Sequence, residues 1–129
     1  MADLLLGQVI RFDGDPFAQP DVAQVLTEGG VLVDQGRIAA VGQAADLRSR
    51  HPQARVHDHG QKLISAGFID AHVHYPQTAI IASWGKRLID WLNAYTFPEE
   101  MRFADPAYAT EIAGRYLDLV LARGTTSVW

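Results

Sequence analysis

The sequence contains no cysteine and little excess charge, and both absences narrow what the chain can do. Its 129 residues offer no cysteine for a disulfide scaffold, a thiolate nucleophile or a Cys-ligated zinc or iron–sulfur site. The 15 acidic and 11 basic residues give a formal net charge of −4. This balance gives no electrostatic reason to expect nucleic-acid binding, which requires a basic patch to displace counterions from phosphates.

Long hydrophobic runs are also missing. The longest apolar stretches have the length of a strand, well below the ~18 residues that a membrane-spanning helix needs. The apolar residues 4–6 follow no basic region and precede no small-residue cleavage site, so they do not form a signal peptide. With 48% hydrophobic and 20% charged residues, the composition is that of a globular chain, and we expect a soluble, cytoplasmic protein.

Residues 1–66 are predicted to form a small β-rich unit. A hairpin is expected around Asp34-Gln35-Gly36, because a glycine-containing loop separates two β-branched runs there. A short helical segment is expected to end at His51-Pro52, since the residue before proline is pushed out of the α region. The polar stretch His57-Asp58-His59 is interpreted as a solvated, turn-like surface that does not bind zinc. The expected strands are residues 4–12, 22–27, 31–33 and 37–41, and the helical segment is residues 44–50.

From residue 63 the pattern becomes that of an α/β unit. Residues 63–74 form a nearly continuous apolar stretch, which is typical of a strand buried on both faces in a parallel sheet. A helix is predicted over residues 86–95, with Pro98 stopping it. Glu99 and Glu100 are then expected to cap or solvate the loop after this proline.

A second helix is better marked at both ends. Asp105 is a plausible N-cap with Pro106 at the first helical position, and Gly124 suits the position after the last turn. The apolar stripe over residues 108–121 is expected to pack in the core. Residues 125–129 begin another β-type run, so the strand–helix–strand order predicts a parallel pair with a right-handed crossover.

His72 and His74 are candidate metal ligands. Residues two apart on a strand share one face, so both imidazoles are expected to project to the same side. They follow the predicted buried strand, and catalytic groups collect at this end of parallel strands. Asp70 shares the face one step deeper, where it could orient a ligand or make a structural hydrogen bond. On spacing alone the pair could equally be incidental to a non-catalytic β-sandwich module.

The wider sequence resembles the amidohydrolase superfamily, and within it the guanine deaminases. The first-strand signature of the superfamily is similar to residues 66–74, AGFIDAHVH. The strings that resemble guanine deaminases are residues 75–78, YPQT, and residues 88–100, LIDWLNAYTFPEE; residues 123–127, RGTTS, are similar to the start of their second barrel strand. The resemblance covers essentially the whole chain. The His-x-His pair is common to the superfamily, whereas the longer strings are much more specific.

The resemblance implies an α/β fold in which a small N-terminal β-sandwich precedes a metal-bearing (β/α)8 TIM barrel. Residues 1–66 would be the N-terminal part of the sandwich, and residues 67–129 the start of the barrel. His72 and His74 would be two ligands of a single zinc ion, and Gln77 would hydrogen-bond the guanine ring through its carboxamide. The other ligands, the proton-shuttling glutamate and an arginine that contacts the base lie on later strands in the family, so we expect no catalytic residue here beyond the metal ligands.

The implied reaction is the hydrolytic deamination of guanine to xanthine and ammonia. Zinc suits it, because the metal lowers the pKa of its bound water to about 7. The other zinc route to base deamination uses cysteine ligands, which this chain lacks. A sister amidohydrolase acting on an oxidised purine, cytosine or a hydantoin remains an alternative. We expect a homo-oligomer, a dimer, that takes a small-molecule substrate and binds neither nucleic acid nor a membrane.

The length of the chain is short for this fold. A (β/α)8 barrel takes about 250 residues, whereas 55 residues follow His74. We therefore expect the N-terminal portion of a longer enzyme, truncated after the first β/α unit and inactive by itself.

Overall fold

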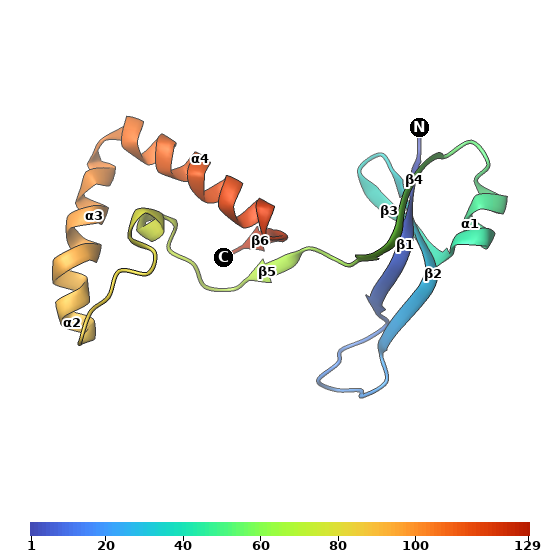
Figure 1. Cartoon of the computed structure of the whole chain (residues 1–129), viewed down its shortest axis with the longest axis horizontal. Helices are drawn as coiled ribbons and strands as arrows, with labels where there is room; N and C mark the ends of the chain where they lie inside the picture. Colours follow the sequence, from blue (N-terminus) through green and yellow to red (C-terminus); the bar gives the residue numbers. More distant parts are fainter. The chain divides into compact units, whose positions relative to one another are not determined.

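The computed structural model describes residues 1–129 as two compact units, Met1–Ala66 and Gly67–Trp129 (Figure 1). The boundary falls where the sequence changes from a β-rich to an α/β pattern. None of the helices combines the length and the apolar character needed to cross a membrane.

The first unit is built on one four-stranded sheet with the strand order β3-β2-β1-β4. Strand β2 is antiparallel to both β1 and β3, whereas β4 runs parallel to β1. The unit contains one sheet, so the second layer of a sandwich stays a prediction. Its elements are β1 (Asp3–Phe12), β2 (Ala23–Asp34), β3 (Arg37–Gln43), α1 (Ala44–Arg50) and β4 (Arg55–Ile64).

The core of this unit lies between the sheet and α1. Leu4 and Leu6 alternate along β1 and therefore point to the same face, where they meet Leu32 of β2. Leu47 of α1 is completely buried against this leucine cluster, so α1 covers that face of the sheet. Isolated helices of this length are unstable in water, so the burial of Leu47 against the sheet stabilises α1.

Glycine has two different roles in β2 and its turn. The predicted hairpin is confirmed: Gln35 and Gly36 both have positive φ, +50° and +74°, as a tight two-residue turn requires. The predicted break before residue 31 is wrong, because β2 continues through Gly29. A Cβ on Gly29 would lie 2.7 Å from Cγ2 of Val9, so this glycine allows β1 side chains to pack closely and does not mark a turn.

The polar residues His57-Asp58-His59, interpreted as a solvated, turn-like surface, lie within β4 and not in a turn, although Asp58 and His59 are exposed as expected. The pairing of β4 with β1 skips from Asp58 to Leu63, which makes a bulge. Within the bulge Gly60 has a φ of +60°, and its N–H donates to Oδ1 of Asp58 at 2.9 Å. Asp58 and Gly60, which are residue types typical of turns, therefore form a bulge inside a strand.

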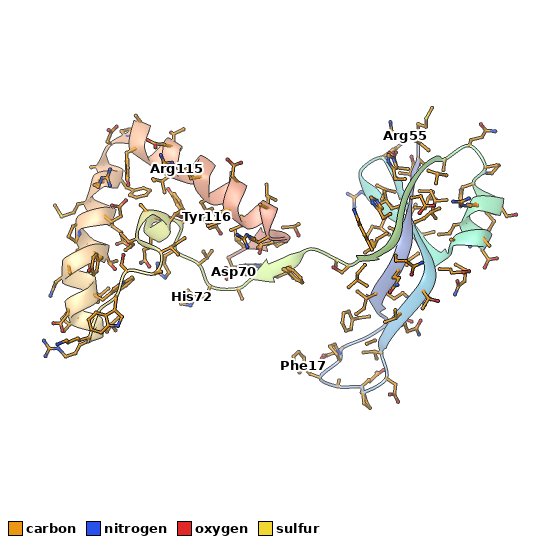
Figure 2. The ribbon with its side chains drawn as sticks, in the orientation of Figure 1. Phe17, Arg55, Asp70, His72, Arg115 and Tyr116 are labelled. Atoms are coloured by element: carbon orange, nitrogen blue, oxygen red, sulfur yellow. The ribbon has the colours of Figure 1, made fainter.

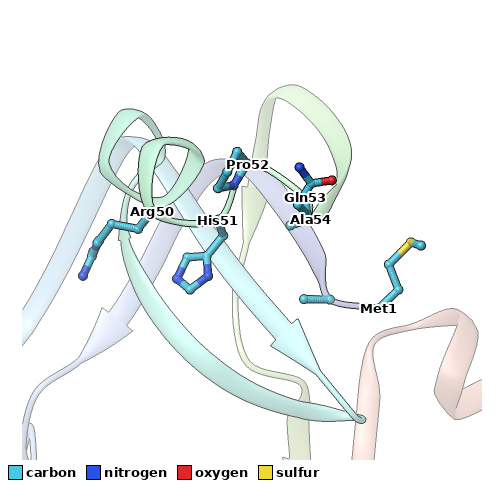
Figure 3. Close-up of a pocket in the computed structure, with 7 residues that line it drawn as sticks. Met1, Arg50, His51, Pro52, Gln53 and Ala54 are labelled. Carbon is cyan, nitrogen blue, oxygen red and sulfur yellow. The ribbon is translucent and has the colours of Figure 1, made fainter.

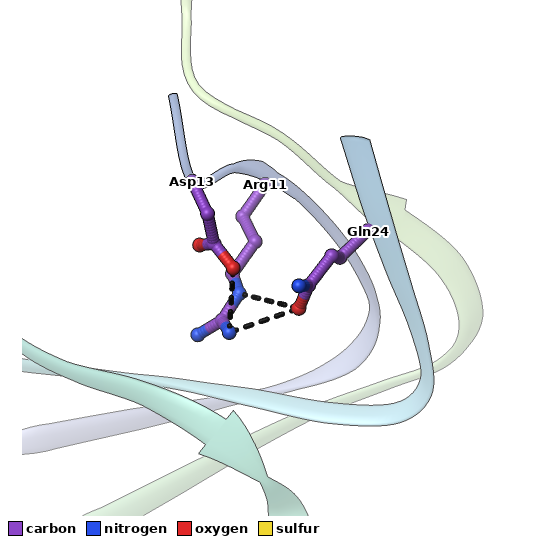
Figure 4. Close-up of polar contacts among 3 residues, drawn as sticks. All are labelled: Arg11, Asp13 and Gln24. Atoms are coloured by element: carbon purple, nitrogen blue, oxygen red, sulfur yellow. Dashed lines mark hydrogen bonds and ion pairs between the residues drawn. The ribbon is translucent and has the colours of Figure 1, made fainter. Parts of the chain in front are cut away.

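The far end of the β1–β2 pair carries a polar cluster (Figure 4). Arg11 pairs with Gln24 across the two strands, and its Nη2 donates to Gln24 Oε1 at 2.9 Å and to Asp13 Oδ2 at 3.1 Å. These side chains are partly exposed to water, so the ion pair contributes little to stability. The cluster fixes the geometry where β1 enters its loop.

The second unit contains a two-stranded parallel sheet and a series of helices. Strands β5 (Phe68–Asp70) and β6 (Thr125–Val128) pair in parallel, which confirms the predicted pairing. No closed barrel is formed by these two strands. The helical elements are η1 (Tyr75–Ile80), α2 (Leu88–Trp91), η2 (Leu92–Thr96), α3 (Phe97–Met101), η3 (Arg102–Ala104) and α4 (Pro106–Ala122).

The single buried strand predicted over residues 63–74 is not observed. Strand β4 ends at Ile64 in the first unit, and β5 has three residues in the second. Phe68 and Ile69 of β5 are 63% and 69% exposed. Their apolar character indicates burial, but no element of this chain covers them.

Pro98 does not stop the helix before it, which corrects the prediction. The helical chain runs from α2 through the π-helical turn η2 into α3, with Pro98 in the first turn of α3. The N–H of Phe97 donates to the carbonyl of Leu92, five residues back. This wider turn changes the hydrogen-bond register just ahead of the proline, and the first turn of a helix tolerates the missing N–H.

Helix α4 has the ends that the sequence predicts. Oδ1 of Asp105 accepts a hydrogen bond from the N–H of Ala107 at 2.9 Å, and Gly124 follows the helix with a φ of +86°. Ile112 and Tyr116 are buried, so part of the predicted apolar stripe packs as expected. Leu117 and Leu121 on the same stripe are more than half exposed.

Candidate functional site

His72 and His74 lie in the segment between β5 and η1. Their Nε2 atoms are 3.0 Å apart, and their ring centroids are 5.1 Å apart. Both rings are exposed to solvent. The strand ends at Asp70, so the structure brings the two side chains together just beyond the strand and not on it.

Asp70 holds the start of this segment (Figure 2). Its Oδ1 accepts a hydrogen bond from the backbone N–H of His72 at 3.1 Å, and its carbonyl accepts from the N–H of Trp129 at 3.0 Å. The side chain therefore ties the backbone of His72 to the end of β5. Of the two roles considered from the sequence, this contact is the structural hydrogen bond.

The histidine pair fits part of a zinc site. In a tetrahedral site with Zn–N distances of about 2.0–2.1 Å, two nitrogen ligands lie about 3.3 Å apart, close to the separation of these Nε2 atoms. A zinc site needs three or four protein ligands. The structure contains no group of three or more His, Cys, Asp or Glu side chains that could hold a metal ion. Two ligands are therefore the most that this chain supplies.

Gln77 lies in η1, three residues beyond His74. Its backbone N–H donates to the carbonyl of His74 at 2.9 Å, and its Nε2 donates to Oε1 of Glu100 in α3 at 3.1 Å. Glu100 was expected to cap or solvate the loop after Pro98, so the sequence did not predict this contact. The two residues are 23 positions apart on different helices, and no periodicity or spacing rule connects them.

Glu99 is buried, which also differs from the expectation for the loop after Pro98. Its side chain is 8% exposed and accepts from Nη1 of Arg102 at 2.9 Å. The hydroxyl of Tyr108 donates a second hydrogen bond to Glu99, and this bond raises the pKa of the Tyr108 phenol. The Arg102 guanidinium lies over the Tyr108 ring, 3.8 Å from its centroid. These contacts join α3 to the start of α4.

Aromatic side chains pack η1 against the helices that follow it. The Tyr75 ring contacts Phe103 edge-on, with centroids 5.6 Å apart, and lies 6.1 Å from the ring of Tyr116. The hydroxyl of Tyr116 and Oγ1 of Thr96 are buried without a hydrogen-bond partner. The packing of Tyr75 against Phe103 and Tyr116 anchors the backbone that carries Gln77.

A hollow in the first unit has a volume of about 480 Å³ (Figure 3). It is lined by Met1, Ala2, Arg50, His51, Pro52, Gln53 and Ala54. No acidic group and no second histidine faces it, so the hollow lacks the set of groups that binds a metal or performs acid–base chemistry. The segment from His72 to Gln77 is the better candidate site.

Comparison with known proteins identifies the family of the chain. The model of the amidohydrolase family matches residues 63–129, and a model described as an imidazolonepropionase-like composite domain of bacteria matches residues 29–54. The chain therefore belongs to the amidohydrolase family.

Within that family the chain is guanine deaminase-like. It is 44% identical over 124 residues to a probable guanine deaminase of Deinococcus radiodurans, covering 92% of this chain and 28% of the relative. The crystal structure of guanine deaminase from Bradyrhizobium japonicum matches 99% of this chain and 28% of its own, with 32% identity and a TM-score of 0.92. Guanine deaminase from C. acetobutylicum, solved with guanine in its active site, matches 99% of this chain and 29% of its own at 28% identity, with a TM-score of 0.83. The chain thus spans just over a quarter of these relatives.

Proposed function

We propose that this chain is the N-terminal portion of a zinc-dependent guanine deaminase that hydrolyses guanine to xanthine and ammonia. The observation that carries the proposal is the approach of the His72 and His74 Nε2 atoms to 3.0 Å, three residues before Gln77. This arrangement occurs in a chain 44% identical to a probable guanine deaminase. The guanine held by the C. acetobutylicum structure supports the choice of ring.

Four residues have a role in the proposed reaction: Asp70, His72, His74 and Gln77. His72 and His74 would hold zinc through Nε2, and Asp70 keeps their backbone in place through its bond to the His72 amide. When bound, zinc would supply an activated water at neutral pH. Gln77 would hydrogen-bond the ring and so orient it, because its carboxamide keeps one acceptor and one donor for a purine edge while its other N–H is bonded to Glu100. The groups that move protons lie outside this chain in the proposal.

The experiment uses the complete protein that carries this sequence. We expect about one zinc ion per subunit by elemental analysis, and the conversion of guanine to xanthine with release of ammonia. Parallel assays with adenine, cytosine, 8-oxoguanine and hydantoin test the sister activities. Robust turnover of one of these rings without turnover of guanine would overturn the substrate assignment.

A pair of double variants tests the metal site. His72→Ala/His74→Ala is expected to reduce zinc from about one ion per subunit to nearly none and to abolish turnover, because two ligands of one ion are removed. The chain offers a matched control, since His57→Ala/His59→Ala removes the other His-x-His pair, which lies in β4. The control is expected to retain zinc and activity. Full zinc content in the first variant would favour a non-catalytic β module.

A further inference from the structure

We propose that Glu100 is a positioning residue that sets the orientation of the Gln77 carboxamide and thereby the ring edge that the enzyme accepts. This inference rests on the proposed function, because it concerns how Gln77 would meet the ring. The hydrogen bond from Gln77 Nε2 to Glu100 Oε1, 3.1 Å long, joins η1 to α3. Both side chains are only partly exposed to solvent.

Glu100 is held in place by the residue before it. Glu99 accepts hydrogen bonds from Arg102 and from the Tyr108 hydroxyl, and it is almost completely buried. Through Tyr108 this contact attaches α3 to the first turns of α4. The hydrogen bond to Glu99 raises the pKa of the Tyr108 phenol, which is the donor in this contact. The neighbouring Glu100 therefore reaches Gln77 from a fixed helix.

The backbone of Gln77 is fixed by a different set of contacts. Its N–H is bonded to the carbonyl of His74, and the Thr78 hydroxyl donates to the carbonyl of Tyr75 at 2.7 Å. The Tyr75 ring packs against Phe103 and Tyr116. With both backbones held, the main freedom left at Gln77 is which end of its carboxamide faces Glu100.

The carboxylate of Glu100 determines which end of the Gln77 carboxamide faces it. The oxygen and the NH2 of a carboxamide have nearly the same shape, so packing alone does not distinguish the two orientations. An ionised glutamate only accepts hydrogen bonds, so Gln77 turns its NH2 toward Glu100. Its Oε1 is then left as the acceptor for a ligand. A ring that offers an N–H donor to Gln77, as guanine can, is selected over one that offers only a ring nitrogen.

A double-mutant cycle in the complete enzyme tests this inference. Glu100→Ala is expected to raise the KM for guanine about tenfold with kcat within about twofold, because the orientation of Gln77 is no longer imposed. Glu100→Gln, which keeps the shape and guards against misfolding, is expected to raise KM about threefold, since its carboxamide can accept but can also turn around. Gln77→Ala is expected to raise KM at least tenfold while zinc content stays unchanged.

The decisive variant is Gln77→Ala/Glu100→Ala. If Glu100 acts through Gln77, the double variant matches Gln77→Ala within about twofold. Multiplied effects would show that Glu100 supports the fold in general, and an unchanged KM in Glu100→Ala would show that it orients nothing; either result overturns the inference. Glu111→Ala is the matched control, because Glu111 makes an exposed ion pair with Arg115 on α4.

The two proposals fail in different ways. A wild-type enzyme that does not convert guanine overturns the proposed substrate, and the same cycle on the ring that it does convert then decides the role of Glu100. A wild-type enzyme that converts guanine, together with independent effects in the cycle, overturns only the role of Glu100. An enzyme that converts no ring of the panel overturns both.

Discussion

Asp3, the first residue of β1, contacts two basic side chains. Its Oδ1 lies 2.7 Å from Nε of Arg55 and 2.7 Å from Nε2 of His57, and both partners stand on the neighbouring strand β4. The hydrogen bond from Arg55, and then that with His57, lowers the pKa of Asp3 from 3.8 to about 2. A depressed carboxyl pKa stabilises the fold above the unfolded pKa, and this contribution is lost as the pH falls from about 4 to about 2.

Asp3→Asn is therefore expected to loosen β4 at neutral pH. We expect amides of residues 55–58 to exchange with solvent about two- to fivefold faster than in the wild type at pH 7, as for a partly exposed ion pair. The difference should shrink as the pH falls through about 2, because the wild-type carboxyl then becomes protonated as well. Hydrogen-exchange mass spectrometry of the complete protein measures this, with Asp21→Asn in the loop before β2 as the control. A difference of unchanged size at and below pH 2 would assign the effect to something other than the charge.

At the scale of single residues, the sequence predicted that His72 and His74 lie together but not the contacts around Gln77. The prediction placed both rings on one face of a strand, whereas the structure brings their Nε2 atoms to 3.0 Å just beyond the end of β5. Glu99 and Glu100 were missed, because two adjacent glutamates after a proline resemble a solvated loop. Their partners, Tyr108 and Gln77, are brought to them only by the packing of separate helices.

Among the elements, α4 has the clearest local determinants. Asp105 caps its first turn, and Pro106 fits the first helical position. Asp105→Ala is expected to lower the free energy of unfolding by about 1 kcal/mol, because the N–H of Ala107 loses its acceptor. Urea unfolding of the complete protein, followed by circular dichroism, provides the measurement.

Asp118→Ala is the matched control for this cap. Asp118 lies inside α4 and makes no ion pair, so its removal is expected to change stability by less than about 0.5 kcal/mol. An equal loss in the two variants would mean that the side chain of Asp105 does not act as a cap.

Elements whose ends depend on distant parts of the chain were predicted less well. Gly29 was interpreted as a break, although it lies inside β2 because β1 packs closely against it. Pro98 was interpreted as a helix end, although the π-helical turn η2 carries the chain into α3. A glycine can mark a turn or a place where two strands approach closely, and a proline can end a helix or lie in its first turn. Only the residues that surround it in space distinguish these cases.

As a whole, the molecule exposes apolar surface that a stable protein buries. Phe68, Ile69, Leu117, Leu121 and Trp129 of the second unit are all more than half exposed. Each large apolar side chain left in water forgoes about 1.5–3 kcal/mol of stabilisation. The first unit buries seven apolar side chains, of which four are the leucines between the sheet and α1. The chain also spans 28% of its Deinococcus relative, which agrees with missing partners for these faces.

The 129-residue chain expressed alone is therefore expected to be poorly folded and inactive. We expect a broad thermal transition by circular dichroism and strong binding of a hydrophobic dye, in contrast to the complete protein. A sharp, cooperative unfolding transition of the isolated chain would contradict this expectation and show that its exposed faces need no partner.

The sequence by itself determined the features that act over a few residues. The turn at Gln35-Gly36, the cap at Asp105 and the spacing of His72 and His74 depend on backbone geometry, which neighbouring residues set. Only the tertiary structure decided that Glu100 meets Gln77, because these residues are 23 positions apart and their helices, η1 and α3, must pack together. A hydrogen bond across such a distance depends on every element between its partners, and no local pattern contains that information.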